Sequence, residues 1–160
     1  MDLRTGTGYD VHQLADGLRF VLGGAEIPFE KGCVAHSDGD VLIHALCDAL
    51  LGALALGDIG NHFPDTDPAY KNIDSRLLLR KVRGLIDREG YEIVNTDSTI
   101  MLQRPKVAPY IMQMRQNLAA DLLLDVSRVS VKATTTEHLG YEGRGEGVTA
   151  ISTVLLKKKQ

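Results

Sequence analysis

The sequence predicts one layered domain of the α+β or α/β class, in which strands and helices share a core. Three observations support this prediction. The length of 160 residues suits one domain, and 44% hydrophobic against 24% charged residues is an ordinary globular composition. Segments with strand and helix periodicity are mixed along the chain. We therefore expect residues 1–160 to fold as a single domain.

The first third of the chain predicts two strands and a helix. Residues 4–12 and 18–23 are expected to be short strands around the turn Ala15-Asp16-Gly17. Ser37-Asp38-Gly39-Asp40 has the S-x-x-D pattern of a capping box and predicts a helix that ends near Ala55. Apolar residues lie nearly all round this helix, so we expect it to be buried in a large core or in an oligomer.

A long loop is expected next, at residues 57–73, and such a loop is usually functional or mobile. Asp74 then predicts the start of a second helix that runs through Glu89 and stops at Gly90. The side chains expected to face the core from this helix are Leu77, Leu78, Val82, Leu85 and Ile86.

The remaining elements are three strands and one helix. Strands are expected at residues 91–103, 128–133 and 148–156, and an amphipathic helix at about Tyr110–Leu124 after Pro105 and Pro109.

Charge and hydropathy exclude several classes of protein. The 18 basic and 21 acidic residues give a net charge of −3, and no nucleic-acid partner is expected. The longest apolar stretch, residues 41–56, is interrupted by His44 and Asp48 and is too short to span a membrane. The N-terminus lacks the apolar segment of a signal peptide. We expect a cytoplasmic protein, or a plastid protein if a transit peptide has been removed.

Asp10 and His12 are the first candidates for metal chemistry. They are two residues apart on a predicted strand, so their side chains share one face. Both residue types bind zinc, and His44 is the best third ligand because it interrupts an apolar helix. The structural alternative is that this D-x-H pair is a chance pattern and that His44 only makes a buried hydrogen bond.

Two further segments are candidate phosphate sites. Residues 36–40 lie at a predicted helix N-terminus, which favours an anion, and the alternative is a plain capping box. Thr134, Thr135 and Thr136 end a predicted strand with hydroxyls that can donate to phosphate, and Glu137 can hold Mg²⁺. The alternative for these threonines is simple β-propensity.

Acidic residues of the 57–73 loop and its end are candidate ligands for sugar hydroxyls or a cation. They are Asp58, Asp65, Asp67 and Asp74. For Asp67 and Asp74 ordinary turn chemistry is the favoured interpretation.

Taken together, these segments are far more specific than any one alone. GYDVH, AHSDGDVLIHALCDALLGALALGDIG, FPDTDPAYK, DSRLLL and VKATTTEHLGYEGRGEG occur in this order over nearly the whole chain. The sequence closely resembles the 2-C-methyl-D-erythritol 2,4-cyclodiphosphate synthase family of the non-mevalonate isoprenoid pathway. The resemblance implies a metal-dependent, CMP-releasing phosphorus–oxygen lyase. Its substrate is 4-diphosphocytidyl-2-C-methyl-D-erythritol 2-phosphate, and its product is the 2,4-cyclodiphosphate.

The resemblance also implies a fold and an assembly. The fold is a two-layer α/β sandwich of the α+β class, with a mixed four-stranded sheet, a small hairpin and helices on one face. The sheets pack around the three-fold axis of a homotrimer, with active sites between neighbouring subunits. Tyr141 and Arg144 match positions at a central cavity where isoprenoid diphosphates can bind. Tyr141 and His138 depart from the usual Phe and Lys there.

Site residues follow from the same resemblance. Asp10, His12 and His44 match the zinc ligands, and Glu137 matches the ligand of a second cation, Mg²⁺ or Mn²⁺. His36 and Thr135 match residues that stabilise the transition state. The other substrate-binding matches are Val11, Ser37, Asp58, Ile59, Gly60, Phe63, Pro64, Asp65, Thr66, Asp67, Thr134, Thr136, Tyr141 and Arg144. The cytidine pocket matches Leu102, Gln103, Arg104, Pro105, Lys106, Val107 and Ala108.

Two other functions remain as alternatives. One is a metal-dependent nucleotide phosphodiesterase, in which water attacks instead of the internal phosphate. The other is a non-enzymatic trimer that binds isoprenoid diphosphates. The substrate loop argues against the first alternative, and the metal triad with Glu137 argues against the second.

Overall fold

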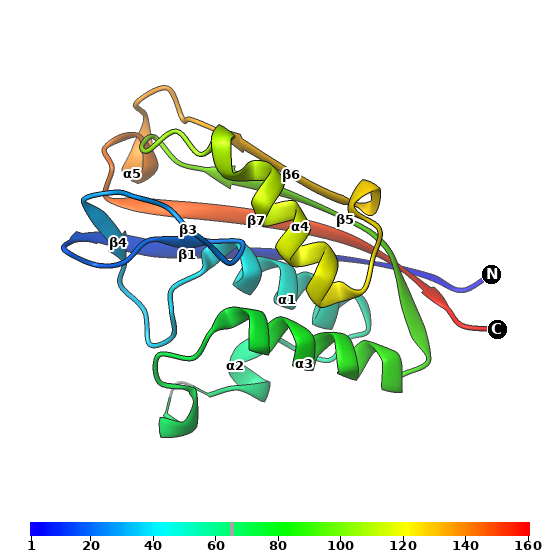
Figure 1. The fold of residues 1–160 in the computed structure, drawn as a ribbon. Coiled ribbons are helices and arrows are strands. Elements are labelled where there is room, and N and C mark those ends of the chain that lie inside the picture. The colour runs from blue at the N-terminus through cyan, green and yellow to red at the C-terminus, as the bar shows by residue number, and fades with distance from the viewer. Residues whose placement is uncertain (65) are drawn as a thin grey trace.

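The computed structural model describes residues 1–64 and 66–160. Its main sheet has the strand order β4-β1-β7-β5-β6 (Figure 1). The strands are β4 (Lys31–Cys33), β1 (Leu3–Asp16), β7 (Gly147–Lys158), β5 (Tyr91–Met101) and β6 (Val129–Thr134). Only β5 and β6 run parallel; the other neighbours are antiparallel. The predicted mixed sheet is confirmed. The three-residue strand β4 adds a fifth strand, at one edge, to the four that were expected.

A separate hairpin joins β2 (Val21–Leu22) to β3 (Ala25–Glu26). Its turn consists of Gly23 and Gly24, both at positive φ, which glycine adopts without a steric penalty. The small hairpin is confirmed. The expected strand pair around residues 15–17 is wrong, because β1 continues through Asp16 and its end pairs with β4.

Three longer helices cover one face of the sheet: α1 (Val41–Ala53), α3 (Ser75–Arg88) and α4 (Ile111–Leu122) (Figure 1). The expected long loop at 57–73 instead contains α2 (Ile59–His62) and a 3₁₀ turn at Pro68–Tyr70. Further 3₁₀ turns lie at Ala108–Tyr110 and Val126–Arg128.

A short helix, α5 (Gly140–Gly143), lies at the end of the sheet away from the two termini (Figure 1). The hydroxyl of Tyr141 contacts those of Tyr9 and Thr149, whose side chains leave the face turned away from α1. The helices are therefore on one face except for this single turn.

Backbone contact between α1 and β1 depends on glycine. A Cβ at Gly6 would lie 2.0 Å from the Ala49 carbonyl oxygen, and one at Gly8 would lie 1.8 Å from that of Ala45. The matching face of α1 carries small residues at four-residue spacing, which are neighbours on a helix. The G-T-G pattern of β1 is thus a packing surface for α1.

The start of α1 differs from the expected capping box. The N-cap is Asp40, not Ser37. The Asp40 carboxylate accepts hydrogen bonds from the backbone N–H groups of Ile43, Gly23 and Gly24. The capping role expected as the alternative is therefore present, made by Asp40, and the anion site at residues 36–40 stays a prediction.

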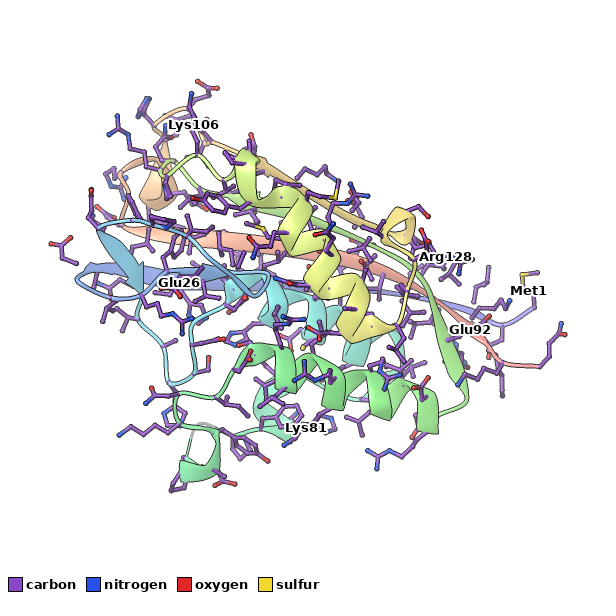
Figure 2. The ribbon with its side chains drawn as sticks, in the orientation of Figure 1. Met1, Glu26, Lys81, Glu92, Lys106 and Arg128 are labelled. Atoms are coloured by element: carbon purple, nitrogen blue, oxygen red, sulfur yellow. The ribbon has the colours of Figure 1, made fainter. Side chains whose placement is uncertain are left out.

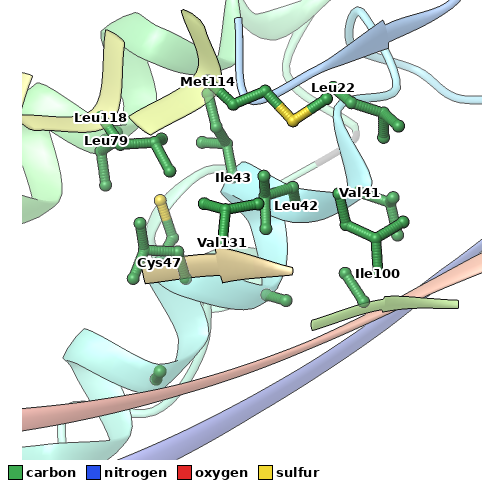
Figure 3. Packing of buried hydrophobic residues seen from close by; sticks show 14 of the residues in the cluster. Leu22, Val41, Leu42, Ile43, Cys47, Leu79, Ile100, Met114, Leu118 and Val131 are labelled. Carbon is green, nitrogen blue, oxygen red and sulfur yellow. The ribbon is translucent and has the colours of Figure 1, made fainter. Parts of the chain in front are cut away.

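The core surrounds α1 on several sides (Figure 3). Leu42, Ile43, Leu46 and Leu50 of this helix are fully buried. The labelled side chains around α1 come from α3 (Leu79), α4 (Met114, Leu118), β5 (Ile100), β6 (Val131) and the hairpin (Leu22). A large core within one chain therefore explains the all-round apolar helix.

The second helix is confirmed between Asp74, its N-cap, and Gly90. One inward residue was wrong: Leu77 is exposed, whereas Leu79 is fully buried. Three consecutive leucines do not reveal which of them faces the core. Among the residues that the structure describes, no helix is both long enough and apolar enough to cross a membrane.

Candidate metal and substrate site

Asp10, His12 and His44 meet where β1 packs on α1. Asp10 Oδ2 lies 3.1 Å from His12 Nε2 and 3.2 Å from His44 Nδ1, and the two nitrogens are 3.1 Å apart. Bonds of about 2.05 Å from a tetrahedral zinc would separate its ligand atoms by about 3.3 Å. The three atoms therefore fit one face of such a tetrahedron. The prediction that Asp10 and His12 point to the same face of a strand is confirmed.

Electrostatics hold the Asp10 carboxyl group in its ionised form. Burial opposes its charge, but hydrogen bonds with His12 and His44 outweigh burial and lower the pKa of Asp10 to about 2. Burial also disfavours a charged His44, yet contact with Asp10 raises the pKa of this histidine above its ordinary value. This donor set offers a negative oxygen and two imidazole nitrogens, which suits a zinc ion.

The second nitrogen of His44 faces two serines. Nε2 lies 3.0 Å from Ser75 Oγ and 3.2 Å from Ser37 Oγ. Ser75 is the first residue of α3, is fully buried, and donates its hydroxyl to Asp38. Sequence reasoning missed Ser75 and treated Asp38 only as part of a capping box, because no local pattern links them to His44.

A cavity of about 350 Å³ opens beside these ligands, and we call it the triad cavity. Its lining is Asp10, His12, Val34, Ala35, His36, Ser37, His44, Ile59, Gly60, Phe63, Tyr70, Ile73 and Leu78. His36 Nε2 is buried and has no hydrogen-bond partner within the described part of the chain. The predicted residues His36, Ser37, Ile59, Gly60 and Phe63 are thus brought to the triad.

The other substrate-binding residues predicted in this loop, as far as the structure describes them, do not line the triad cavity. Asp58 and Asp67 use their carboxylates to accept from the N–H groups of Asn61 and Ala69, so Asp67 has the turn role that was favoured. Pro64 and Thr66 are exposed, and Asp65 lies outside the described residues. Val11 lies on the opposite face of β1 and is exposed there.

Two residues that were not predicted as part of the site anchor this loop. Asp48, one turn after His44 on α1, accepts the N–H of Ile59 at 2.8 Å. Lys81 Nζ lies 5.7 Å from the ring centroid of Phe63 and 5.4 Å from that of Tyr70, within cation–π range. Asp48 carried the same signal as His44, a polar residue in an apolar helix.

A second cavity, of about 210 Å³, lies at the ends of β5 and β6. It is lined by Leu102, Gln103, Pro105, Lys106, Val107, Ala108, Ile111, Ala133, Thr134 and Thr135. Figure 2 shows Lys106 at the end of the molecule far from Met1. The predicted cytidine segment and two of the threonines therefore come together, whereas Arg104 is exposed outside this lining.

Glu137 stands on a turn beside the second cavity. It and His138 both have positive φ, +53° and +62°, which non-glycine residues adopt at a cost. The turn is supported by Thr135 Oγ1, which accepts the Glu137 N–H, and by Gln103 Oε1, which accepts that of His138. Thr136 donates its hydroxyl to the Leu139 carbonyl. The Glu137 side chain is exposed and lines neither cavity.

The predicted isoprenoid-binding residues lie elsewhere. Tyr141 Oη is 2.6 Å from Thr149 Oγ1 and 3.0 Å from Tyr9 Oη. Burial, together with Tyr9 and Glu142, raises the pKa of Tyr141 to about 12, although the hydrogen bond with Thr149 opposes this shift. Arg144 is exposed and pairs with Glu146 at 2.9 Å.

The fold and the triad define a class of protein: an α+β protein with a candidate metal site between a sheet strand and the helix packed on it. The chain belongs to the YgbB family, whose model matches residues 3–157. This confirms the family resemblance read from the sequence.

Individual relatives agree with this membership. The chain is 58% identical over 156 residues to a 2-C-methyl-D-erythritol 2,4-cyclodiphosphate synthase of Chloroherpeton thalassium, covering 98% of this chain and 99% of the relative. Among solved structures, the bifunctional IspDF from Campylobacter jejuni matches with a TM-score of 0.94 at 45% identity, over 98% of this chain and 42% of that one. An IspF from Plasmodium falciparum, in complex with CDP, matches with a TM-score of 0.87 at 34% identity, over 99% and 97%.

Proposed function

We propose that this protein is a 2-C-methyl-D-erythritol 2,4-cyclodiphosphate synthase. It converts 4-diphosphocytidyl-2-C-methyl-D-erythritol 2-phosphate into the 2,4-cyclodiphosphate and CMP. The observation that carries the proposal is the triad of Asp10, His12 and His44, held on the wall of a cavity with His36 and the α2 segment. Relatives of that name, matched over nearly their full length, support it.

The reaction is an internal phosphoryl transfer. An oxygen of the substrate's 2-phosphate forms a bond to the β-phosphorus, and the bond from that phosphorus to the bridging oxygen breaks. CMP leaves with the electron pair. The second pKa of a phosphate is about 6, so the nucleophile is already anionic near neutral pH and needs no general base. Catalysis therefore depends on positioning and on neutralising charge.

This chain's residues fit those two tasks. Asp10, His12 and His44 would hold Zn²⁺ with one coordination position left open. Such an ion supplies Lewis-acid polarisation of a phosphoryl oxygen. Glu137 would bind the second cation, Mg²⁺ or Mn²⁺. His36 Nε2 and the Thr135 hydroxyl would donate to phosphate oxygens, and the second cavity would take the cytidine.

Separation of the two cavities supports a site shared between chains. Of the residues that the structure describes, none lines both cavities. Leu3, Tyr9, Val11 and Ile151 are exposed on the sheet face turned away from α1, where a neighbouring copy can cover them. We therefore propose a cytoplasmic homotrimer of single-domain chains. Each site would combine the triad cavity of one copy with the second cavity of the next, and the central cavity would admit an isoprenoid diphosphate near Tyr141 and Arg144.

Mass spectrometry of the reaction product tests this function. The purified chain is incubated with the substrate, Zn²⁺ and Mg²⁺, and the His44→Ala variant serves as the control. We expect the cyclic diphosphate and CMP in equal amounts, and almost no product from the variant. A linear hydrolysis product would instead identify a phosphodiesterase. Absence of turnover, together with binding of an isoprenoid diphosphate, would indicate the non-enzymatic alternative.

A further inference from the structure

The His44 imidazole is held from its far side by a buried chain of hydrogen bonds. Nε2 contacts Ser75 Oγ, whose hydroxyl is donated to Asp38 Oδ1. Asp38 Oδ2 also accepts the Ser75 backbone N–H, at 2.9 Å, so the carboxylate accepts two hydrogen bonds from Ser75. The Asp40 N–H adds a third donor to Asp38, at 3.1 Å. The proposed reaction itself assigns no role to Ser75 or Asp38.

The placement of protons along this chain follows from the inventory of donors and acceptors. An ionised carboxylate accepts hydrogen bonds and has no proton to give, so the single Ser75 hydroxyl proton points to Asp38. Ser75 Oγ therefore offers His44 only lone pairs. The 3.0 Å contact is then a hydrogen bond donated by Nε2–H. With its proton on Nε2, the neutral ring has a lone pair on Nδ1, the nitrogen that faces Asp10 and His12.

We propose that Ser75, oriented by Asp38, is a positioning residue that fixes His44 in the Nε2–H tautomer and aims Nδ1 at the metal. The inference rests on the proposed function in that zinc is assigned to the triad. Hydrogen bonds of this kind orient metal ligands, and their loss typically costs about 10–100-fold in metal affinity. Because Ser75 is the first residue of α3, these hydrogen bonds also connect that helix to the site between β1 and α1.

Ser37 is a weaker candidate for the same role. Its hydroxyl lies farther from Nε2, at 3.2 Å, and is only half-buried. Its oxygen also accepts the Gly39 N–H, and among the described residues no carboxylate contact directs its proton. Ser75 is both closer to His44 and fully buried, so its geometry leaves less freedom for the ring.

The experiment compares the wild type with Ser75→Ala and with a matched control, Ser98→Ala. Ser98 is also a buried serine, and it loses a 2.8 Å contact with Ser152 that is unconnected to the triad. Long-range ¹H–¹⁵N NMR of the metal-free protein reports the His44 tautomer at a pH where the ring is neutral. Zinc affinity is measured separately, by competition with a chromophoric chelator.

We expect the Nε2–H tautomer in the wild type and in Ser98→Ala. Ser75→Ala is expected to show mixed tautomers and about 10–100-fold weaker zinc binding. If Ser75→Ala does not fold, Asp38→Ala replaces it, because this change removes both carboxylate oxygens that accept from Ser75 and should have the same two effects.

An unchanged tautomer and zinc affinity in the folded variant would overturn the inference while leaving the proposed zinc site intact. If zinc instead fails to shift the His12 and His44 resonances of the wild type, the proposed metal assignment fails. The tautomer comparison, made without metal, still decides the role of Ser75.

Discussion

The triad cavity and the second cavity differ in how far a single chain completes them. In the triad cavity, His44 is 7% exposed and both of its ring nitrogens have partners. The second cavity presents Thr135 and Lys106, which are both exposed, and the adjacent Glu137 has no cation in reach to fix its carboxylate within the described chain. Core packing holds the side chains of the triad cavity in place, whereas several polar side chains of the second cavity are exposed at the surface.

This difference separates two ways of preparing a phosphoryl-transfer site. Ligands for a small ion must be held within tenths of an ångström, so they belong on β1 and α1, which pack closely because β1 carries glycine at the contact. Groups that meet a large nucleotide tolerate more freedom and can complete their surroundings when a ligand or a second copy arrives. Mutations in the two cavities should therefore differ in the size of their effects and in the property that they change.

Loss of a triad ligand should have the largest effect. His44→Ala and Asp10→Asn are expected to lose bound zinc and to reduce kcat by more than the roughly 10²–10³-fold that follows removal of one electrostatic donor. Helix α1 should persist in His44→Ala, because alanine is a good helix former. Metal analysis checks the zinc content, and steady-state kinetics check kcat. Full zinc occupancy in His44→Ala would remove this residue from the ligand set.

Thr135→Ala, in the second cavity, should have a smaller and purely kinetic effect. We expect kcat to fall by about 10²-fold, more than KM rises, with zinc content unchanged, because a donor to the developing charge is lost. The attacking phosphate needs no deprotonation by Thr135, so the loss should be the same at pH 7 and pH 8.5. A lower melting temperature with normal kcat would show a structural role instead.

Gly8→Ala tests whether close packing of β1 on α1 builds the triad cavity. The new Cβ would meet the Ala45 carbonyl, so we expect a loss of about 1–3 kcal/mol in unfolding free energy, and weaker zinc binding as Asp10 moves. Gly84→Ala is the control, because its Cβ would enter open space on helix α3 and should stabilise by about 0.5–1 kcal/mol. Equal effects of the two changes in urea unfolding would contradict this account.

The charge pair in the metal-free triad should give a pH-dependent contribution to stability. The pKa of Asp10 is lowered to about 2, so its contribution exists above its unfolded pKa of about 3.9 and is lost as the pH falls through about 2. The pKa of His44 is raised, so its contribution exists below about 6.5 and is lost as the pH rises through the folded value.

Wild type and Asp10→Asn should therefore differ most between about pH 4 and 6.5, by up to about 2 kcal/mol. Urea unfolding with a chelator present measures this difference. A gap that stays constant from pH 3 to pH 9 would contradict the assigned charges.

Local patterns predicted the parts of the site that depend on periodicity and spacing. Alternation along β1 placed Asp10 and His12 on one face, and Asp74 with Gly90 marked the ends of α3. Partners far apart in sequence were not predictable in this way. Asp40 caps α1 and also binds the Gly23-Gly24 turn, and Ser75 meets His44 from 31 residues away. Such contacts depend on how the elements pack, which no single segment encodes.

Subunit complementation tests the central claim most directly, that each site joins the triad cavity of one copy to the second cavity of another. His44→Ala and Thr135→Ala are unfolded together in equal amounts and allowed to reassemble. Sites that take the triad from Thr135→Ala and the threonine from His44→Ala are fully wild type. Random assembly should then restore about a quarter of wild-type turnover. Activity no higher than the sum of the two separate variants would place both halves of the site within one chain and contradict the account.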